Sequence, residues 1–269
     1  MTIAITSIQR DRNPWIVEWL AFHMMMGFDS FHIYAHRCAD GMDDTLRRLA
    51  RHYPIEVYPV DSSFYIQQIS YQQAWNANKD RVDWMAFIDG DEFLFPTQDG
   101  DIGQALARYA DKDISALAVY WMCYGSSGHI KEPAGLIMEN FRRHAETDFA
   151  SNRHVKSIMR GGRNAQTSRC HVFDTELGTF DEQMRPVTEG WTAYQPSYEF
   201  FRINHYANQS YEYFKNVKQN IGVVDNEVHV VRPDESFTFH DRNECDDGVT
   251  EPFLAPLKRK MAELREALG

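Results

Sequence analysis

The stretch WMAFIDGDE, residues 84–92, joins five apolar residues directly to three carboxylates within four residues. A short continuous apolar run is typical of a strand that is buried on both faces, as in a parallel α/β sheet. In open α/β sheets, ligands bind beyond the carboxyl ends of the strands. We therefore expect a buried strand over residues 84–88 whose acidic end faces a ligand site.

Upstream of this stretch, short β-type runs alternate with helical patterns, as a parallel α/β sheet requires. Strands are predicted over residues 3–8, 31–34 and 55–58, and helices from Asn13, over residues 44–52 and from Tyr65 to residue 78. In the first helix, Asn13 is the expected N-cap, Pro14 lies in the first turn, where its missing N–H does no harm, and Gly27 is the expected stop.

After about residue 111 this alternation is lost, which predicts a mixed α+β part. The expected elements are a strand over residues 117–124, a loop-dominated stretch over 160–200, a short strand over 201–204 and a helix over 210–218. A terminal helix carries one apolar stripe, formed by Leu257, Met261, Leu264 and Leu268. We expect this stripe to dock on the core rather than to lie on a membrane surface.

Composition excludes several classes of function. The chain has 269 residues and a formal net charge of −11, which argues against nucleic-acid binding. Its four cysteines form no CxxC pair, so neither a zinc knuckle nor a disulfide framework is expected. No apolar run approaches the roughly 18 residues of a membrane span, and no signal peptide is evident. We expect a cytoplasmic protein, with peripheral contact to the inner face of a membrane left open.

The acidic cluster needs a positive partner, because three neighbouring carboxylates repel one another. A divalent cation would relieve this repulsion, and oxygen ligands favour Mg²⁺ or Mn²⁺ over zinc. Gly90, between Asp89 and Asp91, lets the backbone turn tightly and lets a ligand approach. A solvated turn without any ligand is the alternative reading. Glu92 is expected to support the loop rather than to bind metal.

Several motifs follow one another in a recognisable order. They are His23 and residues 12–19, 27–29, 33–34, 84–94, 125–129, 156–158, 171–173 and 203–206. The series resembles GT-A glycosyltransferases, most of all the glycosyltransferase family 92 and family 2-like group with its DxDEF signature, over most of residues 5–215. The resemblance implies a Rossmann-like GT-A fold, with a mostly parallel central sheet flanked by helices. Residues 1–110 would bind a nucleotide sugar, and residues 111–269 the acceptor.

The activity that this resemblance implies is metal-dependent transfer of a sugar from a nucleotide-diphosphate sugar, most of all a UDP-sugar, to a hydroxyl of a glycan or glycolipid, with inversion. Mn²⁺ or Mg²⁺ would stabilise the charge that grows on the leaving diphosphate. Asp91 would be the direct metal ligand, and Asp89 would touch the ribose or the metal. His205 is the candidate third metal ligand, and His171 is the alternative candidate for that role.

Inverting transfer also needs a general base to take the proton of the acceptor hydroxyl. Glu139 is the first candidate, because it follows the Gly/Ser turn at residues 125–128 and begins a helix-like segment, and Asp181 and Asp241 are the others. A plain salt bridge from Glu139 to Arg142 or Arg143 is the structural alternative.

Donor-binding candidates include both basic and polar side chains. Arg10, Arg12, Lys156 and Arg160 would meet the diphosphate, and Asn13, Gln72 and Asp89 would also face the nucleotide. The family's nucleotide-contacting carboxylate after the second strand is replaced by Ala35, and Asp40 is the candidate substitute. The Glu of the family's Lys-Asn-Glu opening is likewise replaced, by Pro14. Trp121, Tyr120 and Tyr124 are candidates for stacking on sugar rings.

Two other functions are compatible with a DxD after a strand. One is a phosphotransferase of the haloacid-dehalogenase type, although Glu92 and Phe93 do not fit its pattern. The other is a non-catalytic carbohydrate- or nucleotide-binding protein with a degenerate GT-A site, which the replacements at Pro14 and Ala35 leave open.

Overall fold

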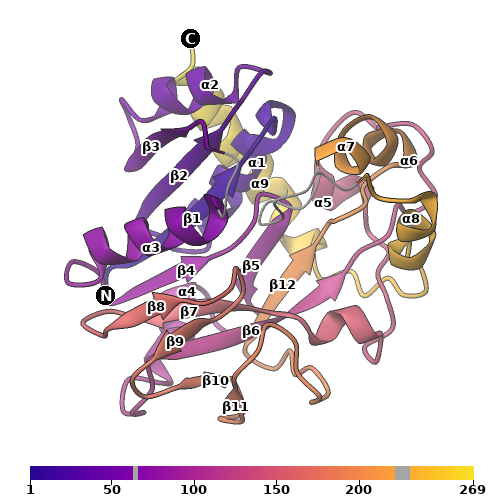
Figure 1. Ribbon diagram of the computed structural model, residues 1–269. Helices are drawn as coiled ribbons and strands as arrows, with labels where there is room; N and C mark the ends of the chain where they lie inside the picture. Colours follow the sequence, from indigo (N-terminus) through magenta and orange to yellow (C-terminus); the bar gives the residue numbers. More distant parts are fainter. Residues whose placement is uncertain (63–65, 222–230) are drawn as a thin grey trace.

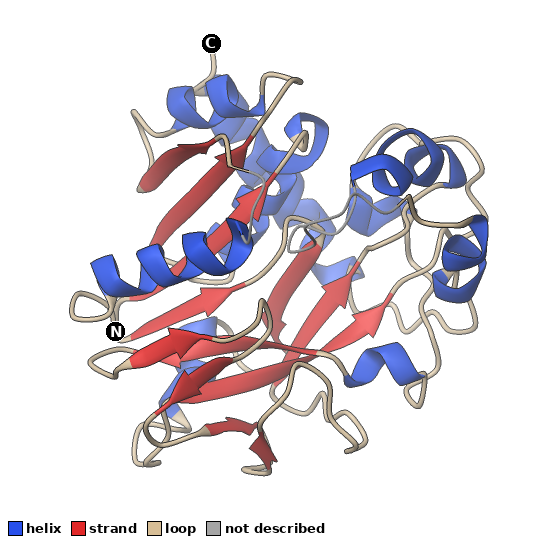
Figure 2. Ribbon diagram, viewed as in Figure 1, coloured by secondary structure: helices blue, strands red, loops and turns tan. Residues whose placement is uncertain are grey.

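The computed structural model describes residues 1–62, 66–221 and 231–269. A ten-stranded mixed sheet forms its centre, in the order β11-β10-β6-β7-β4-β1-β2-β3, with β12 and β5 paired beside β6. Figure 2 shows helices against both faces of this sheet. The expected α/β class, a central sheet flanked by helices, is confirmed.

Four parallel strands form the N-terminal part. The strands are β1 (Ile3–Gln9), β2 (Ser30–His36), β3 (Ile55–Val60) and β4 (Trp84–Phe87), and the connecting helices are α1 (Asn13–Met25), α2 (Met42–Leu49) and α3 (Ile66–Asn78). β1 pairs in parallel with β2 and β4, and β2 pairs in parallel with β3. The predicted alternation is therefore confirmed, while the predicted helix start at Tyr65 lies outside the described residues.

Helix α1 begins one residue earlier than predicted, at the residue expected to be its cap. Arg12 is the N-cap, and Asn13 is the first helical residue. The side chain of Asn13 does not cap the helix because it donates to the carbonyl oxygen of Asp40 at 3.0 Å. Pro14 lies in the first turn, and Gly27 follows the helix end with φ at +92°, a conformation that favours glycine.

The second part adds strands on the other side of β4. They are β5 (Glu92–Pro96), β6 (Ala116–Cys123), β7 (Val155–Arg160), β10 (Thr179–Asp181), β11 (Pro186–Val187) and β12 (Phe201–His205), and β8 (Ala165–Thr167) pairs separately with β9 (Phe173–Thr175). β5 and β7 were not predicted. In β7, the buried polar residues Lys156 and Ser157 interrupt the apolar pattern that would have indicated a strand. The 160–200 stretch is loop-dominated, as predicted, apart from four short strands.

The remaining helical elements follow β5 along the chain. They are α4 (Ile102–Ala107), α5 (Ile137–Asn140), a 3₁₀ turn (Ala150–Arg153), α6 (Tyr211–Tyr213), a π-helical turn (Phe214–Lys218), α7 (Gln219–Ile221), α8 (Asp234–His240) and α9 (Glu251–Glu266). Figure 1 shows α6, α7 and α8 gathered beyond the end of β12. The helix expected over 210–218 is thus present in two pieces.

The terminal helix α9 docks against α1, as predicted. It buries Leu257, Met261 and Leu264, and Leu268 beyond its end packs partly against the same core. No helix in the described parts of the chain is long and apolar enough to cross a membrane.

Candidate functional site

Strand pairing brings the acidic cluster and a distant histidine together. Residues 89–91 form the turn between β4 and β5. β12 pairs with β5, and this register places His205 opposite Glu92. The backbone N–H of Tyr206 donates to the carbonyl oxygen of Asp91 at 2.8 Å. The turn therefore lies at the carboxyl ends of β4 and β12, where the ligand site was expected.

Asp91 is an ionised carboxylate beside a neutral imidazole. Its Oδ2 accepts from Nζ of Lys218 at 2.5 Å, and its Oδ1 lies 3.8 Å from Nε2 of His205. Burial raises the pKa of the Asp91 carboxyl, but Lys218, His205 and Arg12 together outweigh burial and hold that pKa well below its usual range. Burial lowers the pKa of His205 to about 3, so this ring is uncharged at neutral pH.

Asp89 is held from beneath by Lys156 of β7. The ammonium of Lys156 lies 2.7 Å from Oδ2 of Asp89 and 3.7 Å from Oε1 of Glu92. Burial lowers the pKa of Lys156, but the two carboxylates outweigh it and raise that pKa well above its usual range. Glu92 accepts the backbone N–H of Asp89 at 2.8 Å, which supports the loop. The other oxygen of Asp89 accepts from Gln67 at 2.6 Å.

Arg12 fixes the same turn from its other side. Its guanidinium donates to the carbonyl oxygen of Gly90 at 3.0 Å and to the hydroxyl of Tyr213 at 2.8 Å. A Cβ atom on Gly90 would lie 2.6 Å from the side chain of Gln9. Glycine at this position therefore lets the buried Gln9 pack against the turn, in addition to the ligand access that the sequence suggested.

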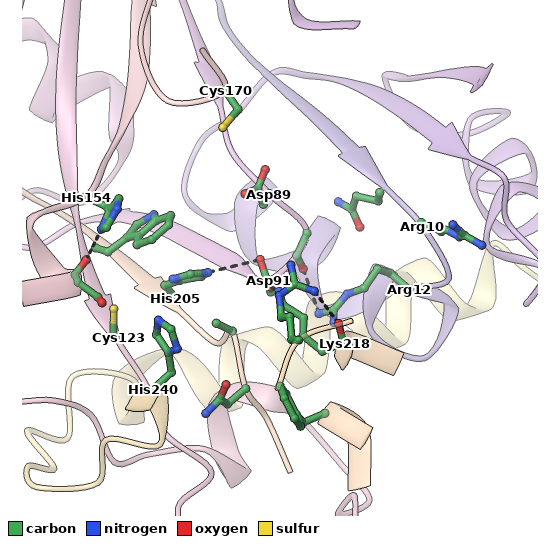
Figure 3. Close-up of a pocket in the computed structure, with 18 of the residues that line it drawn as sticks. Arg10, Arg12, Asp89, Asp91, Cys123, His154, Cys170, His205, Lys218 and His240 are labelled. Atoms are coloured by element: carbon green, nitrogen blue, oxygen red, sulfur yellow. Dashed lines mark hydrogen bonds and ion pairs between the residues drawn. The ribbon is translucent and has the colours of Figure 1, made fainter. Parts of the chain in front are cut away.

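A cavity of about 430 Å³ opens over this turn. Its walls come from both parts of the chain, and they include Arg10, Arg12, His36, Gln67, Asp89, Asp91, Trp121, His154, His171, His205, Lys218, Arg232 and His240. In the view of Figure 3, Asp89 and Asp91 lie between a guanidinium side with Arg10 and Arg12 and an imidazole side with His154, His205 and His240. Within the described residues, the two aspartates are the only carboxylates that line the cavity.

Three imidazoles of the cavity wall present the same nitrogen as a lone-pair donor. His154, His171 and His240 each place Nδ1 within 3.0 Å of a backbone carbonyl oxygen. Since a carbonyl oxygen can only accept, Nδ1 carries the proton in each ring and Nε2 keeps its lone pair. Burial lowers the pKa of all three groups. These rings are therefore neutral at pH 7, and Nε2 can accept a proton or contact a cation.

The sequence pattern of glycosyltransferase family 92 matches residues 1–238. The chain belongs to glycosyltransferase family 92. A family 92 protein of Oryza sativa subsp. japonica is 24% identical over 220 residues, which are 80% of this chain and 34% of the rice protein. The chain thus spans about a third of the length of this curated relative. Family membership and the sheet topology together confirm the expected GT-A fold class.

Solved glycosyltransferase structures are more distantly similar. Residues 1–349 of S. aureus TarS are 12% identical, with a TM-score of 0.39 over 60% of this chain and 47% of that TarS fragment. The mannosyltransferase PcManGT from Pyrobaculum calidifontis, solved with GDP-Man and Mn²⁺, is 14% identical, with a TM-score of 0.37 over 44% of this chain and 35% of PcManGT.

The three base candidates of this family 92 chain lie outside the cavity. Glu139 is surface-exposed and pairs with Lys258 of α9 at 2.7 Å, rather than with a neighbouring arginine. Asp181 is fully buried and accepts from Arg185 at 2.6 Å and from backbone N–H groups of its turn. Asp241 accepts the backbone N–H of Ser126 at 2.6 Å. Each carboxylate therefore holds a turn or a helix in place, away from the cavity.

Several predicted donor contacts are likewise used inside the fold. Asp40 binds the backbone N–H groups of Asn13 and Met42, so the pair Asn13 and Asp40 joins α1 to α2. Gln72 binds the backbone of β8 through Ala165 and Thr167. None of these residues lines the cavity.

Two predicted diphosphate-binding cations likewise do not line the cavity. Lys156 lies under Asp89 with 1% of its side chain exposed, and Arg160 donates to backbone carbonyls of the α4–β6 connection. Arg10 and Arg12 do line the cavity, as predicted. Trp121 lines it too, whereas Tyr120 and Tyr124 are buried in the core.

Sequence reasoning missed four cavity residues that matter: Gln67, Lys218, Arg232 and His240. Gln67 was missed because the face of α3 with Gln72 was chosen, although Gln67 is buried and donates to Asp89. Lys218 closes a predicted helix, but nothing in the sequence links it to Asp91, 127 residues earlier.

Proposed function

We propose that this family 92 chain transfers a sugar from a nucleotide-diphosphate sugar, with a UDP-sugar as the first donor to test, to a hydroxyl of a glycan or glycolipid. The observation that carries the proposal is the cavity in which Asp91 and His205 stand beside Arg10, Arg12, Lys218 and Arg232. A diphosphate is an anion that such a group of cations can bind. The family assignment supplies the reaction class.

A divalent cation fits this site as a partner of the diphosphate. In residues 1–62, 66–221 and 231–269, no three His, Cys, Asp or Glu side chains converge as a complete metal shell. Oδ1 of Asp91 and Nε2 of His205 nevertheless lie 3.8 Å apart, close enough for one cation to contact both. Mg²⁺ is commonly held by one or two protein ligands plus substrate phosphates, and Mn²⁺ shares its preference for oxygen. We therefore assign Asp91 and His205 as the protein ligands of Mn²⁺ or Mg²⁺.

Asp89 takes a different part in this proposal. Lys156 already neutralises it from below, and Gln67 holds its second oxygen, so Asp89 is oriented rather than free. About a third of its side chain, 32%, remains exposed. We assign it to a hydroxyl of the donor's ribose or sugar, which its exposed edge can accept from.

The donor and the acceptor would approach from different sides. Residues 1–110 supply Arg10, Arg12 and His36 at the carboxyl ends of β1 and β2, and the nucleoside diphosphate would lie there. Residues 111–269 supply the imidazole side with His154 and His240, and the acceptor would lie there. When bound, the metal would stabilise the charge of the departing diphosphate as a Lewis acid.

Inversion would require a proton acceptor on the acceptor side. Besides His171, which was the alternative metal ligand, His154 and His240 are the neutral groups of that side whose Nε2 keeps a lone pair. We assign the general base to this pair, with His154 first because its ring stacks on Trp121, with 5.0 Å between the ring centroids, and is thereby oriented. These two histidines replace the carboxylates that the sequence suggested.

A thermal-shift screen of UDP, GDP and CDP, each with and without Mn²⁺, tests the donor site. A ligand at one hundred times its dissociation constant stabilises the native state by about 2.7 kcal/mol. One of the three nucleotides should therefore raise the melting temperature, and the rise should be larger with Mn²⁺ than without it. Arg10→Met should weaken that nucleotide's binding about tenfold, as loss of a charged hydrogen bond does.

The matched control is Arg108→Met, because Arg108 forms an exposed pair with Asp99 outside the cavity. Sugar transfer to a glycan acceptor is then followed by release of the nucleoside diphosphate. No shift with any nucleotide would exclude a nucleotide-sugar transferase, and binding without transfer to any acceptor would favour a degenerate site.

A further inference from the structure

Two lysines neutralise the acidic turn, and they differ in how they are held. Lys156 is 1% exposed and lies between two carboxylates inside the sheet. Lys218 has 24% of its side chain exposed, lines the cavity, and makes its one ion pair within the described residues with Asp91. Lys156 is therefore a permanent part of the fold, whereas the ammonium of Lys218 can exchange its partner.

The main chain of Lys218 is fixed while its side chain is not. A guanidinium N–H of Arg232 donates to the carbonyl oxygen of Lys218 at 2.6 Å, and Arg232 itself lines the cavity. The π-helical turn that ends at Lys218 is anchored at its other end by Phe214, which is buried. A flexible four-carbon side chain on a fixed backbone can move its ammonium by several ångströms through rotamer changes alone.

The ammonium of Lys218 binds one oxygen of the carboxylate whose other oxygen would bind the metal ion beside His205. Oδ2 of Asp91 accepts from Lys218 at 2.5 Å, and Oδ1 faces His205. A dication bound to Asp91 would meet this ammonium at close range, and like charges repel strongly where burial limits screening. A diphosphate arriving in the cavity offers the ammonium a new anionic partner.

We infer that Lys218 makes metal binding depend on the donor. Without nucleotide, its ammonium pairs with Asp91 and opposes metal binding. With nucleotide, the ammonium moves to the diphosphate and leaves Asp91 free to bind the metal. This inference rests on the proposed function, because it takes the ligand to be a nucleoside diphosphate with Mn²⁺. Lys218 is then both the competitor of the metal and a ligand of the donor. Metal and nucleotide should therefore bind with positive coupling, and linkage makes that coupling reciprocal.

Calorimetry of Mn²⁺ and UDP, each alone and each with the other saturating, measures this coupling. In the wild type, UDP should tighten Mn²⁺ binding about tenfold or more, within the usual range of coupling between sites. In Lys218→Met, Mn²⁺ alone should bind about tenfold more tightly than in the wild type, UDP alone should bind more weakly, and the coupling should largely disappear. Lys218→Arg keeps the charge and should retain the coupling.

Lys215→Met is the matched control, because Lys215 belongs to the same π-helical turn, pairs with the exposed Asp234 and does not line the cavity. It should behave as the wild type does. Lys218→Gln, which keeps a polar end, serves as a second variant if Lys218→Met does not fold. Equal Mn²⁺ affinity in the folded Lys218 variant and in Lys215→Met, with UDP still bound, would overturn the inference and leave the proposed function standing. Failure of the wild type to bind UDP with or without Mn²⁺ would overturn both.

Discussion

His23 of α1 is completely buried, and it joins this helix to β5, the strand that follows the acidic turn. Its Nδ1 lies 2.8 Å from the carbonyl oxygen of Trp19, and its Nε2 accepts the backbone N–H of Leu94 in β5 at 3.2 Å. Both contacts require the neutral ring with its proton on Nδ1. Burial lowers the pKa of His23 from 6.5 to about 3.

This shift makes the free energy of unfolding depend on pH. Because the pKa of His23 is lower in the folded state, the unfolded chain binds more protons below pH 6.5, and stability falls as pH falls from 6.5 towards 3. For pKa values of 6.5 and about 3, the loss from this one group reaches about 2 kcal/mol at pH 5. Replacement by a non-titrating residue of similar hydrogen-bonding capacity should remove that loss.

Urea unfolding of the wild type and His23→Gln at pH 7.5 and at pH 5 measures the difference. Glutamine offers one donor for Trp19 and one acceptor for Leu94, and it does not titrate. Other titrating groups are common to both proteins and cancel in the comparison. The fall in unfolding free energy between the two pH values should be about 2 kcal/mol smaller in the variant. Equal falls in the two proteins would refute a neutral, buried His23.

Three further results are expected. Asp91→Asn should abolish transfer and Mn²⁺-dependent binding of UDP in a folded chain, and unchanged Mn²⁺ affinity by calorimetry would remove Asp91 from the metal site. His154→Asn should keep UDP affinity but lower the turnover rate about a hundredfold, as loss of a general base does. Glu139→Gln should leave the turnover rate near the wild-type value. The reverse outcome would make Glu139 the base. Glu18→Ala should lower the unfolding free energy by about 2 kcal/mol in urea titrations, because two buried N–H groups of α5 lose their acceptor. A loss below about 0.5 kcal/mol would contradict that role of Glu18.

Much of the site's framework could be predicted from local patterns. The strand over 84–88, its acidic end and the alternation of the N-terminal part follow from apolar runs and helical periodicity, and the structure has them. Motif order indicated His205 and Arg12, and both line the cavity. Glu139, the first candidate for the base, pairs with α9 outside the cavity, because position after a turn says nothing of which way a short helix faces.

The sequence by itself determined that this is an α/β chain with a carboxylate turn at the end of a buried strand, because periodicity and charge repulsion are properties of neighbouring residues. Only the tertiary structure decided which side chains meet those carboxylates. Lys156 reaches Asp89 because β7 inserts between β4 and β6, and His205 reaches Asp91 because β12 inserts between β5 and β6. Such pairings join residues far apart in the chain, and they depend on how all the strands share one sheet rather than on any local signal.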